Sequence, residues 1–166
     1  FGIESNFSKF VLSESKTHNI KLYKVGGVGF IEEKDVVSKK ELIDKIKVIV
    51  SKASPGDDTY PHKIISEPII ALPKSVCTET YLVIDILENE NQAKNLIKYM
   101  KTNFFRFMMS LVKNTQNITK GVFVFVPKLN MDEEWTDEKL YKKYKLKQDE
   151  IDFIATIVKK MDSSDE

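Results

Sequence analysis

Cysteine and histidine are scarce in this sequence of 166 residues, which holds one cysteine, Cys77, and two histidines, His18 and His62. A single cysteine excludes an internal disulfide, and these three side chains do not complete the four ligands of a structural zinc site. We therefore expect neither a disulfide nor a bound metal. Cys77 is expected to fill a small apolar space in or just before a strand.

Long apolar runs are missing as well. No stretch reaches the roughly 18 to 20 apolar residues that a membrane-spanning helix needs, and no charged, apolar and small-residue succession marks a signal peptide. We expect a cytoplasmic protein. The chain opens with FGIESNF and without an initiator methionine, so we expect it to be a piece of a longer polypeptide.

Arg106 is the only arginine among 26 basic residues, and the net charge of +1 is unevenly distributed. Residues 1–128 hold 19 basic and 14 acidic side chains, net +5, whereas residues 129–166 hold 7 and 11, net −4. A basic body fits attraction to phosphates, and it fits a solvated surface equally well. The scarcity of arginine limits bidentate reading of guanine, so base contacts would depend on Lys, Asn, Gln, Ser and Thr.

Hydrophobic periodicity and turn residues predict a single α+β domain with a mixed or antiparallel twisted sheet, a long central helix and C-terminal helices. Strands are expected at 19–25, 30–33, 46–52, 64–73, 79–87 and 121–127, with Pro68 confining the fourth to an edge or a bulge. A short helix with Ser38 as its N-cap is expected at 38–45. Longer helices are expected from about 91 to 112, at 136–144 and at 147–161, and the last two belong to an acidic helical segment, 129–166.

The helix expected from residue 91 carries an apolar stripe at steps of three and four, which predicts a buried face. Its C-terminal half contributes Met100, Phe104, Phe107, Met108 and Leu111. We interpret these side chains as core rather than as a surface that stacks on bases. Arg106 lies among them and is left with two alternatives, an ion pair at the helix surface or a contact with DNA.

Catalytic patterns are sparse. VGGVGF lacks the third glycine and the following helix of a nucleotide-binding loop, and it is interpreted as a turn. Glu32 and Lys34 have the acid-x-lysine spacing of magnesium-dependent restriction nucleases, and an exposed charged strand end has the same spacing. No spacing connects Cys77 or His62 to a base or a nucleophile.

Three polar and basic segments separate the predicted elements: 13–19, 51–63 and 112–120. A rigid scaffold presents recognition loops in this way, which favours a binding module over an enzyme. Asn114, Gln116 and Asn117 are the candidates for reading adenine, although a polar turn after a helix has the same composition. The full set of candidate DNA-binding residues is Lys52, His62, Lys63, Lys74, Arg106, Lys113, Asn114, Gln116, Asn117 and Lys120.

Five stretches taken together resemble a known family: 1–7, 68–84, 93–117, 122–127 and 135–161. They are similar to the C-terminal target-recognition region of adenine-specific DNA methyltransferases from type II restriction-modification systems, including enzymes that fuse a methylase and a nuclease. A long helix, an apolar strand ending in proline and an acidic helix start also resemble recognition domains of type I specificity subunits.

The resemblance implies a double-stranded DNA target-recognition domain that positions a separate methylase domain, or a fused nuclease domain, of the same polypeptide. It implies no catalytic residue in this fragment, because the family's Asn-Pro-Pro-Tyr type motif is missing and no two prolines are adjacent. S-adenosylmethionine is expected in the parent catalytic domain and no cofactor here. Two alternatives stay open: a magnesium-dependent nuclease domain using Glu32 and Lys34, and a protein-protein assembly module whose acidic tail docks a basic partner.

Overall fold

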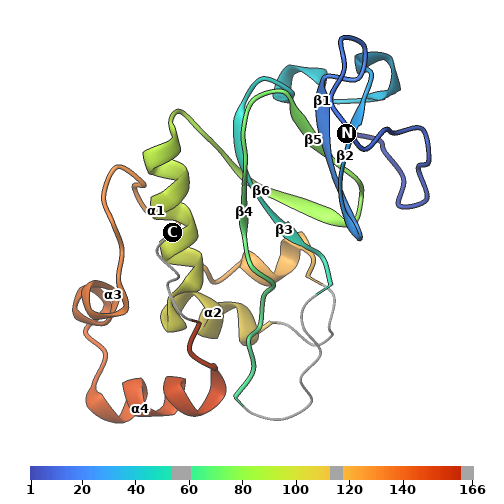
Figure 1. Ribbon diagram of the computed structural model, residues 1–166. Helices are drawn as coiled ribbons and strands as arrows, with labels where there is room; N and C mark the ends of the chain where they lie inside the picture. The colour runs from blue at the N-terminus through green and yellow to red at the C-terminus, as the bar shows by residue number, and fades with distance from the viewer. Residues whose placement is uncertain (54–60, 113–117, 162–166) are drawn as a thin grey trace. The chain divides into compact units, whose positions relative to one another are not determined.

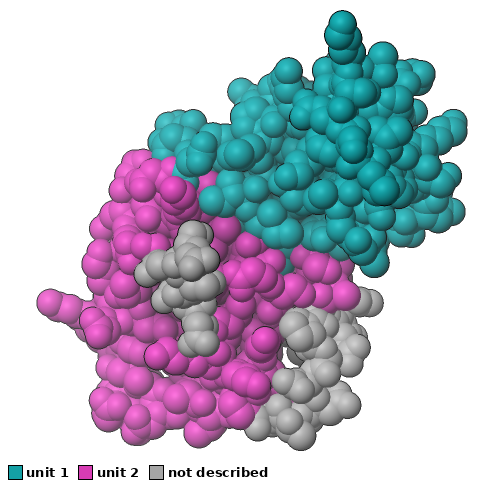
Figure 2. Space-filling model, in the orientation of Figure 1, with its two compact units in different colours: residues 1–50, 69–90 teal, residues 51–68, 91–166 magenta. Residues whose placement is uncertain are grey.

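The computed structural model describes residues 1–53, 61–112 and 118–161 (Figure 1). The chain divides into two compact units, which Figure 2 distinguishes by colour. Unit 1 comprises residues 1–50 and 69–90, and unit 2 comprises residues 51–68 and 91–166. The described part has mixed α and β content, so the predicted α+β class is confirmed. That residues 1–166 act as one domain, and that this domain is of the target-recognition type, stay predictions.

The first sheet of unit 1 has the strand order β2-β1-β5. β1 (Ile20–Lys24) pairs antiparallel with β2 (Gly27–Ile31) and parallel with β5 (Ser75–Cys77). Val25 and Gly26 form the β1–β2 turn. Gly26 and Gly27, the first residue of β2, have φ values of 82° and 130°, which residues with a Cβ rarely adopt. The interpretation of VGGVGF as a turn is therefore confirmed for Val25 and Gly26, whereas β2 begins at Gly27, before the start of the strand predicted at 30–33.

The second sheet has the strand order β4-β3-β6, and its members are β3 (Ile46–Ser51), β4 (Ile69–Ala71) and β6 (Tyr81–Leu87). β3 and β4 are antiparallel. The strand predicted over 64–73 is wrong in length, because Ile64 has a φ of 70° and Pro68 lacks the N–H that a ladder needs. Only the three residues after Pro68 join the sheet.

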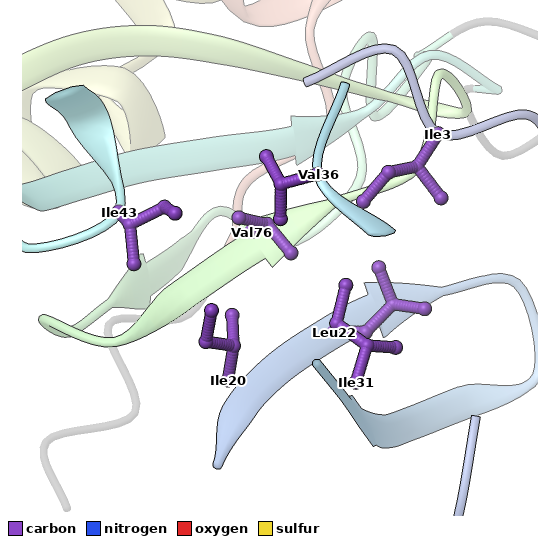
Figure 3. Close-up of a cluster of buried hydrophobic side chains, with 7 residues drawn as sticks. All are labelled: Ile3, Ile20, Leu22, Ile31, Val36, Ile43 and Val76. Atoms are coloured by element: carbon purple, nitrogen blue, oxygen red, sulfur yellow. The ribbon is translucent and has the colours of Figure 1, made fainter. Parts of the chain in front are cut away.

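Apolar side chains from both sheets and from the N-terminal segment form the core of unit 1. Figure 3 shows one cluster of seven buried residues, Ile3, Ile20, Leu22, Ile31, Val36, Ile43 and Val76. Two short 3-10 helices, η1 (Glu33–Asp35) and η2 (Lys40–Leu42), contribute the residues that follow them, Val36 and Ile43. The predicted helix at 38–45 is thus only one turn, and Ser38 is not its N-cap, because Lys39 occupies that position with left-handed backbone angles.

Unit 2 contains two helices where the sequence predicts one. α1 (Glu90–Lys101) ends before Thr102, whose extended backbone starts α2 (Asn103–Ser110). The Thr102 hydroxyl donates to the Tyr99 carbonyl at 2.7 Å and accepts from the Phe105 N–H at 3.1 Å, so it serves the end of one helix and the start of the next. The prediction of one long helix is wrong because of this capping residue.

The break changes which apolar residues are buried. Met100 and Phe104 are buried as expected for core, whereas Phe107 and Met108 are half-buried. Met109, outside that stripe, is fully buried. Leu111 is 54% exposed, so its prediction as core is wrong. Buried Phe105 makes edge contacts with Tyr99 and Phe123. A stripe drawn over one continuous helix therefore misplaces its last members.

The remaining elements of unit 2 are η3 (Lys120–Phe123), α3 (Asp137–Tyr144) and α4 (Gln148–Ile157). The strand predicted at 121–127 is wrong, since η3 occupies its first half and Val124 and Phe125 are more than half exposed. Both C-terminal helices are confirmed, although α4 ends at Ile157 rather than at residue 161, because Val158 is extended and pairs with His62. Across residues 1–53, 61–112 and 118–161, no helix combines the length and the apolarity that crossing a bilayer requires.

Candidate nucleic-acid interface

Arg106 is fully buried in unit 2 and is bonded to the protein itself. Its Nε donates to the carbonyls of Lys101 and Thr102, and its Nη2 donates to Asn103 Oδ1 at 2.9 Å. Burial lowers the pKa of the guanidinium to about 10, which leaves it protonated at neutral pH. The prediction that Arg106 contacts DNA is wrong for this structure, because its donors face protein carbonyls instead of solvent.

The third nitrogen of Arg106 joins two chain segments. Nη1 donates to the carbonyl of Lys63 at 3.3 Å and to the carbonyl of Lys159. Next to these carbonyls, the His62 N–H donates to the Ile157 carbonyl at 3.0 Å and the Lys159 N–H donates to the His62 carbonyl at 2.8 Å. The two segments form a parallel bridge at His62 and Val158. Arg106 therefore fixes the backbone beneath this bridge.

The bridge places three exposed lysines together at one site. Lys63 lies on one side, and Lys159 and Lys160 lie on the other, with their side chains in solvent. We name Lys63, Lys159 and Lys160 the lysine cluster. Exposed cations on neighbouring backbone segments can attract an anion such as a phosphate group. Lys63 was among the predicted residues, whereas the other two were missed because only the tertiary bridge brings the C-terminal segment there.

The described ends of two predicted recognition segments also meet in unit 2. The Ile118 N–H donates to the Lys52 carbonyl at 2.7 Å, and the Ser66 hydroxyl donates to the Ala53 carbonyl at 2.7 Å. Lys120 follows with an exposed side chain at the start of η3, and Lys52 is half-buried. Lys113, Asn114, Gln116 and Asn117 lie outside the described residues.

Lys74 belongs to unit 1, unlike the other described candidates. It has a φ of 58° in the turn before β5, where its carbonyl accepts from the Lys21 N–H at 2.9 Å and its side chain is exposed. Cys77 lies in β5 and is buried, which confirms that it fills apolar space within a strand.

Glu32 and Lys34, the alternative nuclease pair, are bonded to each other at 2.8 Å. The hydrogen bond from Lys34 lowers the pKa of the Glu32 carboxyl, and His18 lies 3.7 Å away on the other oxygen. They line a pocket of about 370 Å³ that also includes Asp35. Among the residues that the structure describes, however, no three His, Cys, Asp or Glu side chains are grouped as a metal site requires.

Comparisons of the chain with protein-family models, with curated proteins and with solved structures return no match. The resemblance to target-recognition domains therefore stays a prediction.

Proposed function

We propose that this chain recognises a specific sequence in double-stranded DNA for a restriction-modification adenine-N6 methyltransferase. In this proposal the chain is a recognition module, and a separate part of the same polypeptide carries out the chemistry. S-adenosylmethionine binds in that catalytic part. An adenine has to leave the helical stack to be methylated there, so the recognition module contributes position and sequence choice.

One observation carries the proposal. Ile118 and Lys52, which are 66 positions apart in sequence, are hydrogen-bonded, and this bond joins the described ends of two predicted recognition segments. Both segments are polar, segment 112–120 is net basic, and segment 51–63 ends at Lys63 in the lysine cluster. Convergence of such segments on one folded unit supplies cations for phosphates beside amide and hydroxyl groups for base edges. A solvated surface with no partner would not require the described ends of these two segments to be hydrogen-bonded to each other.

The proposal assigns different roles to the candidate residues. The lysine cluster has exposed side chains on a backbone that Arg106 holds by hydrogen bonds. This arrangement suits contacts with phosphates. Phosphate contacts position a protein on the duplex without reading its sequence. Under the proposal, Asn114, Gln116 and Asn117 read the bases, since amides can pair with adenine in bidentate fashion in the major groove.

The test is DNA affinity after removal of charges from the lysine cluster. The variants Lys63→Ala and Lys159→Ala are each expected to weaken binding to all duplex sequences alike. Each should also reduce the slope of log affinity against log salt by about one, because each lysine releases about one counterion from DNA. Fluorescence anisotropy at about 50 and 200 mM salt measures both effects.

Lys40→Ala is the matched control, since Lys40 is an exposed lysine in η2 of unit 1. This variant is expected to retain the affinity and the salt slope of the unchanged protein. Equal losses in all three variants would indicate nonspecific attraction to total charge, and unchanged binding in the cluster variants would remove the lysine cluster from the interface.

A further inference from the structure

An apolar groove lies between α2 and α4 within unit 2, separate from the lysine cluster. It has a volume of about 450 Å³. Its apolar lining comes from both helices and from the segment between α3 and α4, namely Phe104, Phe107, Met108, Leu146, Phe153 and Ile154. Phe107 and Phe153 meet edge to face, with ring centroids 6.1 Å apart. Phe153 nevertheless remains 56% exposed, although its ring is large and uncharged.

The charged residues lining this groove are both acidic. Asp149 and Glu150 contribute from the first turn of α4, and no lysine or arginine is among the described lining residues. Glu150 is engaged locally, because its carboxylate accepts from the Lys147 N–H at 2.7 Å as part of the helix start. Asp149 is thus the carboxylate better placed to face a ligand. An apolar floor with an acidic edge complements an apolar stripe flanked by cations.

We propose that this groove binds a basic amphipathic helix of a partner protein segment. The lining residues recur at three- and four-residue steps on α2 and on α4, so their side-chain rows suit the packing of a third helix. A helical ligand satisfies its own backbone hydrogen bonds, which is necessary here because the groove walls are helices and offer no sheet edge. α4 has 10 residues, so the occupant spans about three turns, roughly 15 Å.

The experiment uses the full chain and two synthetic helical peptides that share one leucine stripe. One peptide carries lysines beside the stripe and the other carries glutamates. Fluorescence anisotropy is expected to show binding of the basic peptide at least about 10-fold tighter than that of the acidic one. Phe153→Ala should lower the affinity for the basic peptide by about 10-fold or more, as loss of a central aromatic anchor does. Asp149→Lys should narrow or reverse the preference between the two peptides.

Phe125→Ala is the control, because Phe125 is 53% exposed in the same unit and does not line the groove. It should leave peptide affinity unchanged. Since Phe153 is exposed, its replacement should preserve the far-ultraviolet circular dichroism spectrum, and Asp149→Lys provides a second variant that leaves the packing intact. Equal affinity for both peptides, or retained affinity in Phe153→Ala, would overturn the proposal. Self-association that Phe153→Ala abolishes would also overturn it, by identifying a second copy as the occupant.

Discussion

Arg106 shows how one residue can support a surface without being part of it. A buried guanidinium is costly unless its donors are satisfied, and this one donates to carbonyls from α1, from the segment before Ile64 and from the segment after α4. The sequence offered two alternatives for Arg106, an acid or DNA. In the structure, Arg106 donates mainly to backbone carbonyls. Such acceptors leave no pattern in a sequence, because every residue has a carbonyl.

Lys47 is a second buried cation. It has no exposed surface, and its ammonium donates to the carbonyls of Leu42, Ile43 and Lys45 at 2.8, 3.2 and 2.6 Å. These carbonyls lie at and after the end of η2, where their partial negative charge favours a cation. Desolvation nevertheless lowers the pKa of Lys47 to about 8.

Lys47 makes stability depend on pH in a defined direction. The unfolded chain holds this proton up to a pKa of about 10.5, whereas the folded chain releases it near 8. Between these values unfolding takes up a proton, so the free energy of unfolding rises with pH across the window. Urea titrations measure the free energy of unfolding of the unchanged protein and of Lys47→Met. The value for the unchanged protein minus that for the variant should rise by on the order of 2 kcal/mol from pH 7 to 10. Parallel pH curves for the two proteins would contradict this explanation.

At the scale of the element, the start of α2 is stabilised by another helix. The two carboxylate oxygens of Asp137, the first residue of α3, accept from the N–H groups of Asn103 and Phe104, each at 2.9 Å. These are two of the donors that a helix start leaves without partners. The negative charge also complements the helix dipole of α2.

Asp137→Ala should therefore lower the free energy of unfolding by about 1 to 2 kcal/mol, the usual cost of losing a cap. The neighbouring variant Glu138→Ala removes an equal charge from an exposed position of the same helix and should change stability by less than about 0.5 kcal/mol. Chemical denaturation monitored by circular dichroism measures both. A loss of equal size in the two variants would assign the effect to charge alone.

The elements also show which sequence signals were sufficient. Alternation of apolar and polar residues predicted β1, whereas β3 and β6 were predicted from short apolar runs between turn residues. The run GVFVFVP has no such period, and a uniform apolar run does not separate a strand from one helical turn. The prediction of a strand there failed for that reason. The prediction of a continuous helix failed because the Thr102 hydroxyl ends α1 and starts α2 through its hydrogen bonds with the Tyr99 carbonyl and the Phe105 N–H.

At the scale of the whole molecule, local pattern predicted the α+β class but not the candidate interface. Lys159 and Lys160 are separated from Lys63 by about a hundred positions of sequence, and the bridge at His62 and Val158 brings them together. The bond between Lys52 and Ile118 is equally nonlocal. Contacts between distant segments depend on packing of the whole unit, and a single sequence contains no period that reports them.

Selection from a randomised duplex library tests the central claim, sequence-specific recognition of DNA, most directly. The 166-residue chain would be incubated with the library at about 50 and 200 mM salt, and the bound fraction would be sequenced. We predict enrichment of one short motif at both salt concentrations, with lower total recovery at the higher one because phosphate contacts weaken. Recovery of DNA at low salt without enrichment of any motif, or no recovery at either concentration, would contradict the account.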